Sequence, residues 1–407
     1  YRVKMKAVTL SIKHIRILRL FLGSIGAWPA DYLGGSLTPL ERFFRIEIPF
    51  NATVVTFGLA NCIVQKAGIV DFYTLGDFII TMFLSALTMR SLIPSFHRYG
   101  MVSQKFFLSF HLYNYRHKGG YYKMLTDKVS YYFTIFMMIM MVFGLSLFNI
   151  TPLCNNYING AFSKAGLKEN ATYEFAVYFI LPKYDPVDHF TLTTMLNVVF
   201  SWRCAVAVCS IDLFLCLMVF QIIAHSQVLK YNLGHLIGEQ TVEECSVDAL
   251  TVRNFSVQVN DIVRDKLREC VDHYRMIVDF IKDMSNFFGL MLALNYLFHL
   301  ICCCLLLLEC SSGALTQIIR FGPLTLIIFG QLLIISITFE VIGTETDKLP
   351  AAVYSTPWEL MDARNQKTAY LLLKMAQTPI QVTALGLTPV GVQTMAKVLR
   401  ITYILFS

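Results

Sequence analysis

Residues 195–224 read MLNVVFSWRCAVAVCSIDLFLCLMVFQIIA, an apolar run whose only charges are Arg203 and Asp212. A helix needs about 20 apolar residues to cross the hydrocarbon core of a bilayer, so this run is long enough to span a membrane. Comparable runs recur along the chain at residues 46–65, 72–93, 130–150, 285–310, 322–343 and 386–406. The sequence therefore predicts an all-α membrane protein with seven transmembrane helices.

The composition supports a membrane protein and excludes several other classes. Of 407 residues, 56% are apolar and only 15% are charged, whereas soluble domains carry about 25% charged residues. The chain shows no nucleophile elbow, phosphate-binding loop, dinucleotide fingerprint or zinc-protease motif, and its histidines lack metal-ligand spacing. We therefore expect no enzyme activity, no cofactor, no metal site and no nucleic-acid partner.

The basic residues indicate how the chain crosses the membrane. Residues 1–45 hold 8 Lys or Arg against 2 acids, and residues 94–128 hold 6 against Asp127 alone. Residues 151–194 hold 3 basic residues against 4 acids. Since positively charged loops stay in the cytoplasm, the N-terminus is expected inside and, after an odd number of spans, the C-terminus is expected outside. This orientation argues against a G-protein-coupled receptor, whose N-terminus lies outside.

The loop at residues 151–194 is therefore predicted to be extracellular. It contains the sequon Asn170-Ala171-Thr172, which predicts glycosylation at Asn170. Cys154 in this loop and Cys310 at the end of a span are the cysteines placed for an oxidising compartment, and whether they pair stays open. Nearly all the other cysteines fall in apolar runs, where thiols behave as small hydrophobes.

Two segments outside the spans show helical periodicity. In the N-terminal segment, Ile12, Ile15, Leu18 and Leu22 recur with Lys13, Arg16 and Arg19 between them. This pattern predicts a helix on the membrane surface. Residues 225–279 carry 6 basic and 9 acidic residues with helical spacing of the apolar ones, which predicts cytoplasmic anchor helices that pack on a partner. The alternative is a solvated helical extension, and His273 within it is assigned to a structural hydrogen bond rather than to catalysis.

Charged residues within the spans raise the possibility of a secondary transporter, because burial of charge is costly and often functional. They are Asp77, Arg90, Arg203, Asp212 and Glu340. Arg90 and Glu340 lie near predicted inner ends, where snorkelling to the interface satisfies them. Arg203 and Asp212 are too far apart on one helix to touch. Because the chain shows no inverted repeat, a structural role is favoured over transport.

The spans are rich in large, soft side chains. One short stretch contains Phe136, Met137, Met138, Met140, Met141 and Phe143. Gly144 among these neighbours would leave a hollow, and unbranched Met adapts to irregular apolar shapes. The pattern predicts an apolar pocket for a lipophilic small molecule, with specificity from shape and a few polar groups. The alternative is that these side chains face lipid or one another.

The last span, 386–406, is more polar than a lipid-facing helix tolerates. Its polar members are Gln393, Thr394, Lys397, Arg400, Thr402 and Tyr403. Such a helix suits the wall of a water path. Leu399, Tyr403 and Phe406 share one face. Thr402 is adjacent, and an apolar ring there would gate a pore if several subunits supplied the same helix. The alternative is a bundle helix whose polar side packs on its neighbours.

Several motifs are typical of one family of membrane proteins. They are Leu267-Arg268-Glu269-Cys270-Val271-Asp272-His273-Tyr274 before the fifth span, Leu181-Pro182-Lys183-Tyr184-Asp185-Pro186 in the outer loop, Pro357-Trp358, Ala376-Gln377-Thr378-Pro379 and Val398-Leu399-Arg400-Ile401-Thr402-Tyr403. On these residues the chain resembles the insect odorant receptor family. The early Gly26-Ala27-Trp28-Pro29 is similar to moth pheromone receptors.

The resemblance implies an odorant- or pheromone-gated, non-selective cation channel at the plasma membrane of a sensory neuron dendrite. The chain would be the tuning subunit of a tetramer with the odorant receptor co-receptor, embedded in membrane lipid. The pore would be built from the last span of each subunit, with the gate at or just after Phe406. A gustatory-type channel subunit stays open as an alternative. A G-protein-coupled receptor and a secondary transporter are less favoured.

The resemblance also implies a ligand pocket in the outer half of the second, third, fourth and sixth spans. At that depth it assigns to the ligand Ile79, Met82, Phe83, Met141, Gly144, Phe148, Phe200 and Ile327. The expected organisation is an N-terminal segment at 1–45, a ligand-binding bundle of four spans at 46–224, anchor helices at 225–284, the fifth and sixth spans with the cytoplasmic part of the seventh at 285–385, and a pore-lining span at 386–407.

Overall fold

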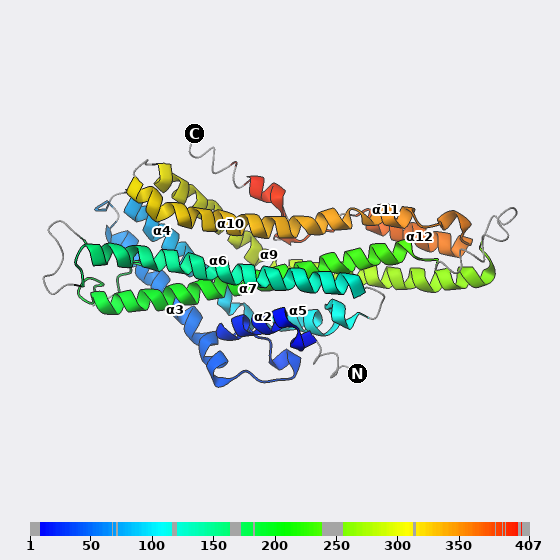
Figure 1. Cartoon of the computed structure of the whole chain (residues 1–407), viewed down its shortest axis with the longest axis horizontal. Coiled ribbons are helices and arrows are strands. Elements are labelled where there is room, and N and C mark those ends of the chain that lie inside the picture. Colours follow the sequence, from blue (N-terminus) through cyan, green and yellow to red (C-terminus); the bar gives the residue numbers. More distant parts are fainter. Residues whose placement is uncertain are drawn as a thin grey trace.

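The computed structural model describes residues 9–66, 68–70, 72–115, 120–162, 172–181, 184–237, 255–311, 315–378, 380–384, 386, 388–397 and 400. The elements in chain order are α2 (Lys13–Ser24), η1 (Asp31–Leu33), α3 (Pro39–Lys66), α4 (Phe72–Leu87), η2 (Thr88–Ser95), α5 (His97–Lys105), η3 (Phe106–Phe110), η4 (Leu112–Asn114), α6 (Gly120–Ile158), α7 (Phe190–Gly234), α9 (Val257–Ser311), α10 (Leu315–Thr346), α11 (Leu349–Tyr354), η5 (Trp358–Leu360), α12 (Ala363–Ala376), β1 (Thr383–Ala384) and β2 (Thr388–Pro389). The molecule is elongated, and most of its long helices run along the long axis (Figure 1).

The described residues include six helices that are long and apolar enough to cross a membrane. They coincide with the first six predicted spans and are Pro39–Lys66, Leu75–Ser95, Gly120–Ile158, Phe190–Gly234, Val257–Leu308 and Leu324–Leu360. The predicted seventh span, 386–406, lies largely outside the described residues, which contain a helical stretch at 392–397. A small antiparallel hairpin of β1 and β2 leads into that stretch.

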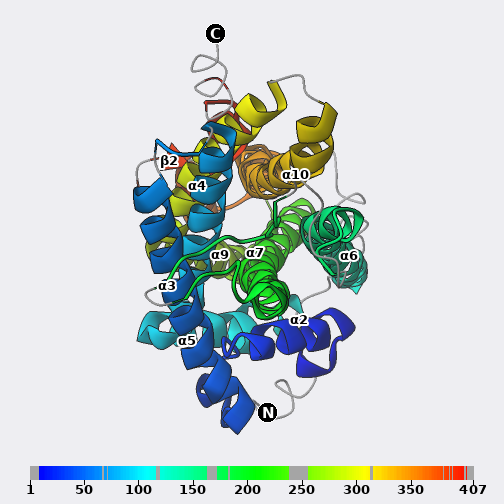
Figure 2. The same ribbon diagram turned by 90° about the vertical axis from the view of Figure 1, so that its left-hand side faces the viewer.

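Helix α7 is the central element of the bundle. Viewed along the long axis, it lies in the middle of the other helices, with α6 and α10 on one side and α3, α4 and α9 on the other (Figure 2). In its most apolar 18-residue window, 83% of the residues are buried inside the protein, more than in any of the other five candidate spans. The near-continuous apolar run at 195–224 is therefore explained by contact with protein on all sides.

Several helices are much longer than a bilayer is thick. Helix α9 has 55 residues, which is about 80 Å at 1.5 Å per residue, against about 30 Å of hydrocarbon. The far ends of α7 and α9 lie beside α11 and α12 and form the end of the molecule opposite the outer loops (Figure 1). Here Tyr274 donates to the carbonyl of Met375 at 2.7 Å. His273 Nε2 lies 2.9 Å from His225 Nδ1, in agreement with a structural role.

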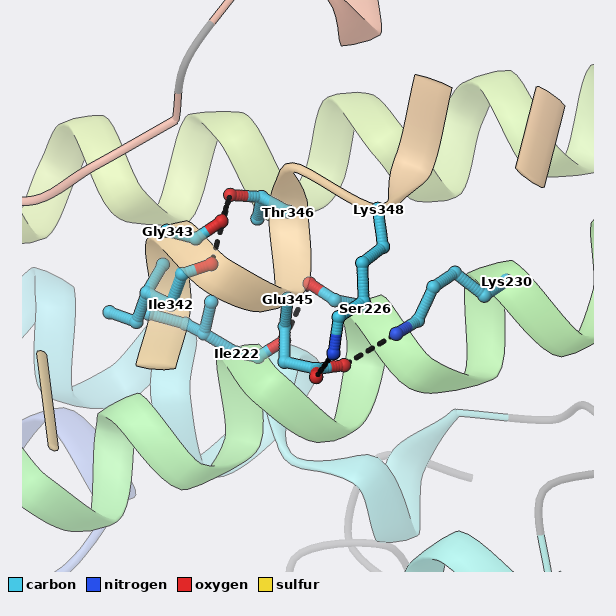
Figure 3. Close-up of polar contacts among 8 residues, drawn as sticks. All are labelled: Ile222, Ser226, Lys230, Ile342, Gly343, Glu345, Thr346 and Lys348. Atoms are coloured by element: carbon cyan, nitrogen blue, oxygen red, sulfur yellow. Dashed lines mark hydrogen bonds and ion pairs between the residues drawn. The ribbon is translucent and has the colours of Figure 1, made fainter. Parts of the chain in front are cut away.

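An ionic cluster joins α7 to α10 at the predicted cytoplasmic side. Glu345 lies between Lys230 and Lys348, and its Oε1 accepts from Lys348 at 2.7 Å (Figure 3). Beside it, Thr346 donates to the carbonyl of Ile342 at 2.9 Å. Partly exposed ion pairs of this kind contribute about 0–1 kcal/mol each. The cluster therefore connects the two helices and adds little to the stability of the protein.

The N-terminal helix α2, which the sequence predicts to lie on the membrane surface, packs its apolar face on protein. Its apolar residues Ile15, Leu18 and Leu22 are buried in the main core, and the helix contacts α6 and α7. The amphipathic pattern is the same in both arrangements, since a helix face that avoids water can be covered by lipid or by other helices. The sequence pattern therefore predicts the buried face and not what covers it.

Two buried histidines lie where α2 docks on the rest of the protein. His14 is 1% exposed, its ring stacks on that of His111 with centroids 6.3 Å apart, and its Nδ1 lies 3.8 Å from Asp127. Burial lowers the pKa of His14 from 6.5 to about 4. Burial also lowers the pKa of His111, with further lowering from nearby His14, His225 and Lys123. Both imidazoles are therefore neutral when α2 is docked.

We expect α2 to loosen as the pH falls between about 6.5 and 4. In this window His14 binds a proton when α2 is undocked and does not when α2 is docked. The free energy of docking therefore becomes less favourable by about 1.4 kcal/mol for each pH unit. Above about pH 6.5, the neutral His14 makes its full contribution to the stability of the docked helix. Hydrogen-exchange protection of residues 13–24, corrected for the intrinsic rate, measures this. His14→Gln should weaken the pH dependence and His235→Gln, at an exposed position, should keep it. Protection that does not change with pH in the wild type would contradict the argument.

Two predictions concern the outer loop. Asn170, the predicted glycosylation site, lies outside the described residues. Cys154 and Cys310 are both free, so the structure does not pair them. The thiol of Cys310 lies 3.6 Å from the hydroxyl of Thr325 on α10. Cys154 is exposed near the end of α6.

Candidate functional site

An apolar cavity of about 180 Å³ lies inside the transmembrane bundle. Its wall is formed by side chains from α3, α4, η2, α6, α7 and α10, together with Val177 of the outer loop. Aliphatic residues, methionines and Phe148 and Phe200 make up most of it, and a few polar side chains interrupt them. A cavity of this kind binds a small molecule mainly by removing apolar surface from water.

Five of the eight residues assigned to the ligand by sequence line this cavity. They are Met141, Gly144, Phe148, Phe200 and Ile327. The other three, Ile79, Met82 and Phe83, are on α4 and lie outside the wall. Met82 and Phe83 pack instead against two neighbouring apolar clusters.

The face of α4 explains the three residues that lie elsewhere. The second span contributes Thr81, Leu84, Ser85 and Thr88 to the wall, and these follow the three- and four-residue spacing of one helix face. The sequence argument chose residues by their depth in the bilayer. Depth is set by position along the span, whereas facing the cavity depends on how the helix is rotated against its neighbours.

Gly144 lies where α6 comes close to α10. A Cβ atom at this position would lie 3.2 Å from Cδ1 of Ile327, on the opposite wall. Any larger side chain would therefore enter the space between the two helices. The cavity depends on this glycine for part of its volume.

A buried ion pair lies beside the cavity and is absent from the sequence expectations. Asp212 of α7 is 1% exposed and is paired with Arg90 of η2, which is 7% exposed. Gln331 of α10 donates to the second carboxylate oxygen at 2.8 Å. Arg90 also lies 3.5 Å from the amide oxygen of Asn295 on α9. The expectation that Arg90 snorkels to the interface is wrong, because its guanidinium is enclosed by protein.

Arg203 takes part in a second ionic contact at another part of the cavity wall. Its Nε lies 3.6 Å from Glu47 of α3, and its guanidinium lies 4.2 Å from the ring centroid of Phe44. Asn51 hydrogen-bonds to the same carboxylate. The prediction that Arg203 and Asp212 do not touch is confirmed, because each finds its partner on a different helix.

Glu340 connects α10 to the beginning of the last helical stretch. Its Oε2 accepts a hydrogen bond from the backbone N–H of Val392 at 3.0 Å. Gly391 permits this approach, since a Cβ there would lie 2.1 Å from the same oxygen. The carboxylate therefore satisfies a free N–H at the start of a helix instead of snorkelling.

The remaining predicted site residues cannot be placed. The pore and gate residues Leu399, Thr402, Tyr403 and Phe406 lie outside the described residues. Within the part of the chain that the structure describes, no three His, Cys, Asp or Glu side chains are grouped to hold a metal ion.

The sequence is similar to those of known odorant receptors. The family described as 7tm Odorant receptor matches residues 127–403. Odorant receptor Or2 of Anopheles gambiae is 22% identical over 143 residues, which are 35% of this chain and 38% of that protein. Odorant receptor 49a of Drosophila melanogaster is 25% identical over 145 residues, which are 35% of this chain and 36% of that protein. The matches thus span little more than a third of each relative.

The fold has a counterpart of known structure. The insect olfactory receptor OR5 from Machilis hrabei covers 96% of both chains with a TM-score of 0.74 at 15% identity. Its complex with eugenol gives a TM-score of 0.65 at 15% identity, over 99% of this chain and 96% of that one. This similarity confirms the predicted seven-helix transmembrane fold. Since the family match runs from the third span to the last and covers more than half of the chain, the chain belongs to the 7tm odorant receptor family, whose members are receptors and not enzymes.

Proposed function

We propose that this chain is the tuning subunit of an odorant-gated, non-selective cation channel. A lipophilic volatile would occupy the cavity beside Gly144 and open a pore lined by the last span. The observation that carries the proposal is the apolar cavity itself, inside the bundle of an odorant receptor family member. Burial at about 25 cal/mol per Å² suffices to hold a small molecule that has few polar groups. The complex of OR5 with eugenol supports a small-molecule ligand in this fold.

Helix α10 offers a physical link between the cavity and the pore. Ile334 and Ile335 line the cavity, and Glu340 on the same helix holds the backbone of Val392. A ligand that displaces α10 would therefore move the start of the last span. We propose that this movement widens the apolar ring around Leu399, Thr402, Tyr403 and Phe406.

The channel would assemble with the odorant receptor co-receptor in the plasma membrane of a sensory neuron. Exposed apolar side chains on α9 and α12, at the predicted cytoplasmic end, support an interface there. They are Val257, Ile262, Tyr370 and Leu371, with 78%, 50%, 63% and 50% of their surfaces exposed. Apolar surface at the end of the molecule away from the spans is costly unless a partner covers it.

Recording from cells that express this chain with and without the co-receptor tests the proposal. We expect volatile alcohols, aldehydes or esters to evoke a cation current only when both chains are present. Surface labelling of an epitope-tagged chain serves as the control for expression. A complex that reaches the surface and stays silent toward a broad panel of volatiles would overturn the proposal.

A further inference from the structure

One amide in the cavity wall has an orientation that the surrounding charges determine. Gln331 lines the cavity, and its Nε2 donates to Oδ2 of Asp212 at 2.8 Å. The other oxygen of Asp212 is bound by Arg90. A carboxylate paired with a guanidinium accepts hydrogen bonds and donates none, so only the NH₂ end of the amide can face it. The usual ambiguity between the two ends of an amide is therefore resolved here.

The consequence is that Gln331 offers its carbonyl oxygen on the side away from Asp212. Among the residues that the structure describes, no donor to this Oε1 atom is found. The atom is also not among the buried, unpartnered oxygens, so it keeps contact with open space. Since the side chain is part of the cavity wall, the polar atom available to a ligand is an acceptor.

Three other polar groups of the cavity wall have already used their hydrogens. The hydroxyls of Thr88 and Ser85 donate to the carbonyls of Leu84 and Ala52 at 3.3 and 3.2 Å. The thiol of Cys204 lies 3.4 Å from the same Leu84 carbonyl. What these three groups leave for a ligand are lone pairs, so they add acceptors and no donor to the cavity wall.

The charged hydrogen-bond donor of the cavity wall, Arg203, lies away from Gln331 and Asp212. Arg203 is nine residues before Asp212 on α7, which places it about 14 Å away along the helix axis and on the opposite face. Its guanidinium is engaged by Glu47 and by the ring of Phe44. The Gln331 side and the Arg203 side of the cavity are therefore chemically distinct.

We propose that the Gln331 side of the cavity selects ligands that carry a hydroxyl group. A ligand with a hydroxyl group donates a hydrogen bond to Gln331 Oε1. An aldehyde of the same length has only an acceptor oxygen to place against Oε1, which is itself an acceptor. An alkane leaves Oε1 without a hydrogen-bond partner. The inference rests on the proposed function, because it takes this cavity as the ligand site. It adds the chemical class of the ligand and a specificity-determining residue.

Binding of matched ligands to the purified complex of this chain with the co-receptor, in lipid nanodiscs, tests the inference. The probes are octanol, octanal and octane, and displacement of a fluorescent apolar reporter gives their affinities. We expect octanol to bind about three- to tenfold more tightly than octanal, the range of one hydrogen bond. In Gln331→Met, which keeps length and removes the acceptor, this ratio should fall to about one. The control Ile334→Met changes another cavity residue of α10 and should keep the ratio.

The outcomes separate this inference from the proposed function. Equal affinity of octanol and octanal for the wild type overturns the hydroxyl preference and leaves the cavity as the ligand site. If none of the three probes displaces the reporter, the cavity itself is not the site and the proposed function fails as well. A ratio that persists in Gln331→Met shows that another residue supplies the selectivity. Should that variant not fold, the comparison of the three probes on the wild type still decides the preference.

Discussion

Replacement of Asp212 by leucine will keep the receptor from reaching the cell surface. The Arg90 guanidinium would remain buried with no carboxylate to balance it, and Gln331 would lose its acceptor. Removal of one partner of a buried ion pair costs about 3–5 kcal/mol. That is a large part of the roughly 5–15 kcal/mol by which a typical domain is stable. Surface biotinylation and thermal unfolding of the detergent-solubilised protein measure the effect.

Two further variants make this result specific. Asp188→Leu removes an exposed acid from the outer loop and should leave surface expression unchanged. The double variant Arg90→Met, Asp212→Leu removes both charges, so it should recover much of what the single change loses. If Asp212→Leu reached the surface at the wild-type level, the ion pair would not be needed for folding.

Replacement of Gly144 by leucine will abolish the response to ligand while the protein still folds. The first added carbon already lies 3.2 Å from Ile327, so the rest of the side chain must occupy the cavity. Gly144→Ala should shrink the cavity less and gain up to about 1 kcal/mol of helix stability. We therefore expect a graded loss of affinity, smaller for alanine and complete for leucine, in odorant-evoked currents or in direct binding.

Gly330 provides the matched control for the cavity-filling change. It lies on α10, and a Cβ atom there meets no other atom within 4 Å. Gly330→Leu therefore adds the same side chain to a membrane helix without filling the cavity, and binding should be retained. Loss of binding in both variants would mean that the helices tolerate no leucine. Retention in both would show that ligands bind elsewhere.

The residues of the cavity were predictable only in part. Met141 and Gly144 were identified because Met-rich surroundings and a glycine in a bulky stretch have a local meaning in the sequence. The face of α4 that lines the cavity, with Thr81 and Ser85, was missed. Thr81, Ser85 and Thr88 recur at helical spacing, so a polar stripe marked this face in the sequence, but a choice of residues by depth did not use it.

The pairing of charges shows the same limit more clearly. The sequence identified Arg90 and Asp212 as charges within spans, but 122 residues separate them. Each alone is compatible with snorkelling, with transport or with a structural pair. Gln331 carried no signal, since a single amide in an apolar run becomes informative only once a carboxylate fixes its orientation.

The membrane class, six of the spans and the buried face of α2 follow from the sequence without any structure, because each depends on a run of neighbouring residues and on the thickness of a bilayer. Other features depend on residues far apart in the chain. They are the protein surface that covers this face of α2, the partners of Arg90 and Arg203, and the wall of the cavity. Such contacts arise when helices pack, and packing is set by the shapes of both surfaces together. The folded bundle therefore supplies the cavity and its hydroxyl-accepting side, which no single span contains.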